Sequence, residues 1–108
     1  MNENGENKSG RREADDLQAL ASASLRQTEA EEQAGSLNLA EVQYIRALRA
    51  QEQLLMLTGK ICWASAARES CSALADLCLQ QGNMHGADFY YARMLAYDQQ
   101  HRLRTEQG

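Results

Sequence analysis

Three side chains that could bind a metal recur every seven residues in the second half of the chain: Cys71, Cys78 and His85. Protein zinc sites, however, usually pair ligands two to four residues apart. Gly82 also interrupts the expected helix before His85. We therefore interpret Cys71 and Cys78 as small core residues, which buried free cysteines often are, and predict no metal site.

The stretch QQGNMHGADFYYARML, residues 80–95, places two glycines before an aromatic run. Such a stretch could hold a phosphate or stack a base, or it could form the corner of a helical hairpin. The chain has no phosphate-loop, dinucleotide-binding or metalloprotease motif. Its serines lie among alanines, in segments expected to be helical. We predict a protein that is not an enzyme and has no cofactor.

The composition predicts an all-α fold. The 108 residues include no proline and are rich in alanine, leucine, glutamine and glutamate, which favour helices. The β-branched aliphatic residues number only three, Val42, Ile45 and Ile61, too few to build a sheet.

Charge and hydropathy indicate the expected partners and location. A net charge of −4 argues against nucleic acid, whose partners usually show a basic surface. No apolar stretch approaches the roughly 20 residues that span a bilayer, so we expect no membrane partner. An odd number of cysteines and the lack of an apolar leader predict a cytoplasmic protein.

Glycines divide the chain into expected elements. Residues 1–12 contain no hydrophobic residue after Met1 and are predicted to form a disordered arm. A single helical domain is expected over residues 13–106, interrupted at Gly35, Gly59 and Gly82. It would contain four antiparallel helices as two stacked helix–turn–helix hairpins. Hairpin 1 covers about 13–58, with helices over 13–34 and 38–58, and hairpin 2 covers about 61–104, with helices over 61–81 and 84–104.

The two hairpins share an internal repeat at an offset of 47 residues. Residues 33–48, QAGSLNLAEVQYIRAL, align with residues 80–95. The identical pairs are Gln33/Gln80, Gly35/Gly82, Ala40/Ala87, Tyr44/Tyr91, Arg46/Arg93 and Leu48/Leu95. In each copy the glycine should end the first helix in a left-handed conformation. The alanine should allow close helix packing, and the tyrosine and leucine should be buried between helices.

The repeat resembles a tetratricopeptide repeat, most closely over residues 72–98. Gly82 stands at the turn glycine, Ala87 at the small residue that opens the second helix, and Tyr91 at the aromatic position. The offset of 47 exceeds the family's 34 residues, as in its extended members, and the usual proline is replaced by Gln99. The resemblance implies an α-solenoid fragment. A plain four-helix bundle remains the alternative.

The resemblance implies a function in protein–protein interaction. The first helix of each hairpin would line a concave surface that contacts a partner. The residues placed there are Leu25, Glu29, Glu32, Gln33, Ser72, Asp76, Leu79 and Gln80. We add Tyr90, which has no aromatic counterpart in the first copy. The acidic set predicts a basic or amphipathic protein or peptide partner, although a solvated acidic face would look the same.

We therefore predict an interaction module that acts as an adaptor, a small assembly subunit or a dedicated chaperone. The alternative is a self-associating helical bundle with a structural role as a homo-oligomer.

Overall fold

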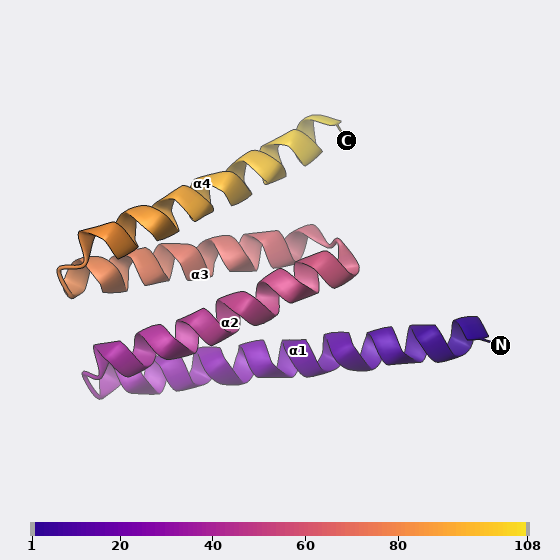
Figure 1. Ribbon diagram of the computed structural model, residues 1–108, viewed down its shortest axis with the longest axis horizontal. Helices are drawn as coiled ribbons and strands as arrows, with labels where there is room; N and C mark the ends of the chain where they lie inside the picture. The colour runs from indigo at the N-terminus through magenta and orange to yellow at the C-terminus, as the bar shows by residue number, and fades with distance from the viewer. Residues whose placement is uncertain (1, 108) are drawn as a thin grey trace.

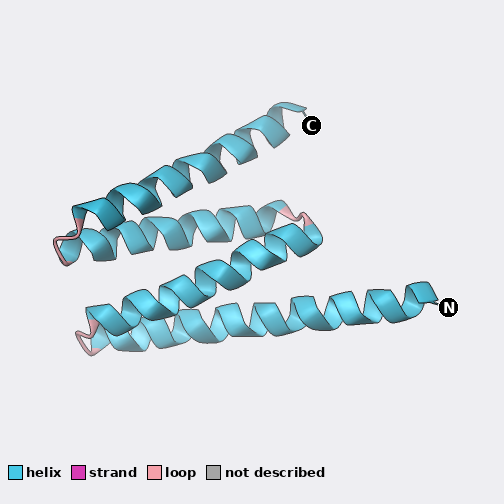
Figure 2. Ribbon diagram, viewed as in Figure 1, coloured by secondary structure: helices cyan, strands magenta, loops and turns pink. Residues whose placement is uncertain are grey.

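The computed structural model describes the backbone of residues 2–107 and the side chains of residues 10–100. Its four helices are α1 (Asn2–Gln33), α2 (Leu37–Thr58), α3 (Ile61–Gln80) and α4 (Met84–Gln107). Figure 2 shows helices joined by short turns, and no strand occurs among residues 2–107. The predicted all-α fold with two helical hairpins is confirmed.

Each helix connection contains a glycine in the left-handed conformation. The φ angles of Gly35, Gly59 and Gly82 are 79°, 67° and 75°, values that strain any residue with a Cβ. The predicted turn glycines of both hairpins are therefore confirmed. The Asn83 side chain accepts a hydrogen bond of 3.0 Å from the Gly86 N–H and so caps α4. Ser36 precedes α2 but makes no side-chain cap.

The first helix is longer than predicted. It begins at Asn2 instead of residue 13, so residues 2–12 continue α1 where we expected a disordered arm. The segment contains no proline, and an isolated glycine weakens a helix without having to end it. Met1, which we also assigned to this arm, lies outside the described residues.

The helices form an open, flat stack (Figure 1). Within the described chain α1 packs on α2, α2 on α3 and α3 on α4, and the backbones of other helix pairs do not approach one another. The molecule measures 54 × 34 × 17 Å along its principal axes. In a closed four-helix bundle the first and last helices would meet. Here α1 and α4 do not meet, so they are the two outer helices of the stack in the described chain.

The core lies where the hairpins meet. Leu48 of α2 is buried with Ala67, Cys71 and Leu74 of α3. Side chains that are partly buried pack around this cluster from α2 and α4: Tyr44, Ile45, Tyr90, Met94 and Tyr97.

The predicted burial of the repeat alanines and of two cysteines is confirmed. Ala40 and Ala87 are both fully buried, as expected for positions of close helix approach. Cys71 and Cys78 are buried too, whereas the His85 side chain is exposed.

The predicted burial of the repeat's leucine is wrong in the second copy. Leu48 is buried, but its counterpart Leu95 is 57% exposed, and Tyr44 and Tyr91 are both only half-buried. The physical reason is topological, since α3 covers the α2 surface that contains Leu48. No helix of the described chain covers the same surface of α4.

Candidate partner-binding surface

The predicted binding residues of α1 lie beside a tyrosine of α2. Burial, together with the charges of Glu32 and Glu29 and a hydrogen bond to Glu32, raises the pKa of Tyr44. Leu25 and Gln33 of the same set are exposed on α1. Glu32 and Glu29 of α1 therefore lie close enough to Tyr44 of α2 to affect its hydroxyl.

One of the predicted residues of α3, Asp76, contacts α4 within the second hairpin. The Tyr91 hydroxyl donates a hydrogen bond of 3.5 Å to Asp76. Both hairpins pair a carboxylate on the first helix with a tyrosine on the second, but not at equivalent positions: Tyr44 bonds Glu32, whose counterpart is Leu79, whereas Tyr91 bonds Asp76. Leu79 and Gln80 are exposed, and Ser72 is half-buried.

The predicted set therefore divides into two similar halves. One half belongs to the first hairpin and the other to the second. The backbones of α1 and α3 do not approach one another in the described chain. The structure does not gather the eight residues into one site. Their role in binding stays a prediction.

Tyr90 has a structural role that the sequence did not indicate. Its ring packs against the core cluster at the hairpin junction and lies edge-on to Phe89, with 5.1 Å between the ring centroids. Burial and the nearby Cys78 raise the pKa of its hydroxyl. Tyr90 is half-buried, and its role in partner binding stays a prediction.

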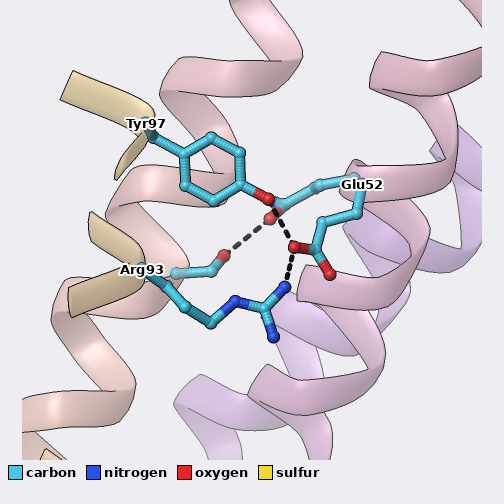
Figure 3. A network of polar contacts seen from close by, with 5 residues as sticks. Glu52, Arg93 and Tyr97 are labelled. Atoms are coloured by element: carbon cyan, nitrogen blue, oxygen red, sulfur yellow. Dashed lines mark hydrogen bonds and ion pairs between the residues drawn. The ribbon is translucent and has the colours of Figure 1, made fainter. Parts of the chain in front are cut away.

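A polar network joins α2 to α4 at the junction (Figure 3). Arg93 and Tyr97 both donate hydrogen bonds to the Glu52 carboxylate. Burial and the bond to Glu52 raise the pKa of Tyr97 to about 12. The sequence did not indicate this network, because Glu52 lies 41 residues from Arg93 and 45 residues from Tyr97. The network orients α4 on the stack, since it bridges two helices that are not neighbours in sequence.

A second buried polar contact lies close by. The Ser70 hydroxyl donates a 2.7 Å hydrogen bond to the Gln51 side chain, and both residues are buried. Each polar group therefore has the partner that burial requires. Burial raises the pKa of the adjacent Cys71 thiol to about 11, which makes it a poor nucleophile at neutral pH.

A cleft of about 560 Å³ opens between α1 and the α2–α3 corner. Its walls include Trp63, Leu57 and the charged side chains of Arg11, Asp15 and Lys60. The charges are of both signs and do not converge on one point of chemistry. Among the described residues no group of three or more His, Cys, Asp or Glu side chains could hold a metal ion.

The outer helices expose apolar side chains that the inner helices bury. Leu95 of α4 corresponds to the buried Leu48 of α2. Leu20 of α1 is 49% exposed and corresponds to Ala67 of α3, which is fully buried. Sequence periodicity could not find this difference, because it reports the face of a helix and not whether another helix covers it.

Comparison with known proteins adds no identification: no family model, no curated protein and no solved structure matches the chain. The tetratricopeptide-like resemblance stays a prediction from the repeat. None of the helices described here is both long and apolar enough to cross a membrane.

Proposed function

We propose that this chain is a non-enzymatic protein–protein interaction module that presents a helical surface to a partner protein. The observation that supports the proposal is the exposed apolar surface of α4. Its most exposed large apolar side chains are Met84, Phe89 and Leu95, each more than half exposed. Met84 and Leu95 share one side of the helix, about three turns apart, and exposed apolar side chains on one face are typical of association sites.

The repeat indicates what kind of partner would pack against this face. On α2 the equivalent surface is covered by α3, through the cluster of Leu48, Ala67, Cys71 and Leu74. Ala92 and Leu95 of α4 occupy the positions of Ile45 and Leu48 of α2 in the repeat. A helix with small side chains and a leucine would fit against it, as α3 fits α2. This is a helix-on-helix mode of recognition.

The acidic sets on α1 and α3 supply a second feature of the proposal. Glu29, Glu32 and Asp76 are exposed carboxylates, and a basic or amphipathic partner segment would complement them. An adaptor, a small assembly subunit and a dedicated chaperone all use surfaces of this type. The cytoplasm is the proposed location.

Affinity capture tests the proposal, with the immobilised chain exposed to an extract of the cells that produce it. We expect a stoichiometric protein to be retained by the wild type and lost with Leu95→Glu, because a charge in a helix interface must be desolvated. Met56→Glu is the matched control, since Met56 is 88% exposed on α2. Equal retention by all three proteins would place the partner away from α4, and no retention by the wild type would reject the module.

A further inference from the structure

The two ends of the stack expose two halves of an interface that the molecule already contains. The α2 half consists of residues that meet α3. Leu48 and Ile45 pack on the core cluster, and Glu41 accepts hydrogen bonds from Cys78 at 3.9 Å and Gln81 at 3.5 Å. The counterparts of these α2 residues lie on α4: Leu95, Ala92 and Asp88. All three are exposed.

The positions of the α3 half of the interface have equivalents on α1, with different residues. Ala67, Ser70 and Leu74 of α3 are buried. Their counterparts on α1, at the same offset of 47 residues, are Leu20, Ala23 and Gln27. All three α1 residues are exposed, and Leu20 also lines a shallow hollow with Arg46 and Arg49 of α2. The first helix therefore displays the same positions as the α3 surface, with different side chains.

We propose that the partner of the α4 face is a second copy of this chain, whose α1 packs against α4 as α3 packs against α2. This inference rests on the proposed function and assigns its partner. The contact joins two different surfaces, so each added copy leaves one free α4 and one free α1. Stacking of this kind continues head to tail and does not close at a dimer.

The junction between copies is weaker than the junction within a copy. Gln27 replaces Leu74 and Ala92 replaces Ile45, which removes more apolar surface than Leu20 adds in place of Ala67. Asp88 replaces Glu41, and the α1 counterpart of Cys78 is Glu31. Two carboxylates would face one another where the internal junction pairs a carboxylate with donors. Association is therefore reversible, and salt strengthens it by screening this repulsion.

Sedimentation velocity of the purified full chain over a range of concentrations tests the stacking. We expect the average mass to rise with concentration without reaching a fixed oligomer. Leu95→Glu and Leu20→Glu should each reduce the protein to a monomer. Both residues are exposed, so the folded chain tolerates the charge, and circular dichroism checks that the helices persist. Met56→Glu should behave as the wild type.

Mixing the two monomeric variants gives the decisive result. The Leu95→Glu chain keeps an intact α1 face, and the Leu20→Glu chain keeps an intact α4 face. An equimolar mixture should therefore form a heterodimer and nothing larger. If α4 instead paired with α4, Leu20→Glu would still dimerise and the mixture would form no heterodimer, which would overturn the head-to-tail assignment.

A gain of association provides the complementary test. Asp88→Asn removes one carboxylate of the opposed pair and should raise the association constant about two- to fivefold at low salt. If both the wild type and Asp88→Asn stay monomeric at every concentration and salt level, self-stacking is rejected. That result leaves the proposed function standing wherever capture through the α4 face still retains a different protein, so the two failures are distinguishable.

Discussion

The two hairpins are built alike and buried differently. Both have a turn glycine with positive φ, a fully buried alanine at the start of the second helix and a carboxylate–tyrosine pair between their helices. Yet Leu48 of the first hairpin is 3% exposed, whereas the equivalent Leu95 of the second is 57% exposed. Local sequence therefore sets the shape of each hairpin, and the place of the hairpin in the stack sets which side chains are covered.

The same residue type therefore has two different roles at the repeat position. A leucine that is covered by another helix stabilises the fold, and a leucine that is not covered is available for association. Stacked repeats make the distinction sharp, because each helix contacts only its nearest neighbours in the stack. The most informative experiments therefore compare equivalent residues of the two hairpins.

The largest expected effect comes from truncating the matched leucines. Leu48→Ala should lower the free energy of unfolding by about 2–5 kcal/mol, because it removes a buried side chain and leaves a cavity in the junction cluster. Leu95→Ala should change it by about 0.5 kcal/mol or less, as expected for an exposed position. Urea unfolding of dilute protein, followed by circular dichroism, measures both values. Equal losses at the two positions would contradict the open stack.

The sequence predicted much of the hairpins and little of their surroundings. Gly35 and Gly82 marked the turns correctly, and Ala40, Ala87, Cys71 and Cys78 marked the core, because each reflects a local steric requirement. The exposure of Leu95 could not be predicted in this way. It depends on whether a further helix exists beyond α4, and helical periodicity carries no such information.

The candidate binding residues stay a prediction. The set on α1 and the set on α3 were expected to share one concave surface; the structure shows Glu29 and Glu32 beside Tyr44, and Asp76 beside Tyr91. The Glu52 network was not foreseen, because Arg93 and Tyr97 follow Glu52 by 41 and 45 positions in the sequence. Partners at such separations are invisible in a single sequence.

A second comparison concerns what the hairpins share. Gly35→Ala and Gly82→Ala should each cost about 1–2 kcal/mol, because alanine resists the left-handed conformation. A Cβ at either position would meet nothing within 4 Å, so the cost is in the backbone and should be nearly the same in both hairpins. Thermal or urea unfolding measures it.

Gly10→Ala is the control for this pair. Gly10 lies within α1, has no positive φ and has open space around it. Alanine there should stabilise the protein by up to about 1 kcal/mol, since glycine is unfavourable inside a helix. Clearly unequal losses at the two turns would show that the hairpins are not equivalent, and a loss at Gly10 would show that the turn losses are not specific to the left-handed conformation.

The smallest expected effect tests a polar feature that the hairpins do not share. Glu52→Gln removes the charge that holds Arg93 and Tyr97, whereas the α4 counterpart of Glu52, Gln99, has no such role. Because the Glu52 and Arg93 side chains are partly exposed, the loss of stability at neutral pH should be only about 0.5–1 kcal/mol. Glu13→Gln, an exposed change on α1, should have no measurable effect.

The pH dependence distinguishes this network from a general loss of packing. The pKa of Tyr97 is raised from 10.0 to about 12, first by burial and then by its bond to Glu52. Below pH 10 Tyr97 is protonated in both the folded and unfolded states. Between pH 10 and 12 the unfolded chain releases the proton while the folded chain keeps it, so the free energy of unfolding falls as the pH rises. In Glu52→Gln the pKa should drop but stay above 10.0, because burial remains, and this decline should be smaller. Ultraviolet absorbance of tyrosinate follows the titration, and an unchanged titration curve would mean that Glu52 does not hold Tyr97.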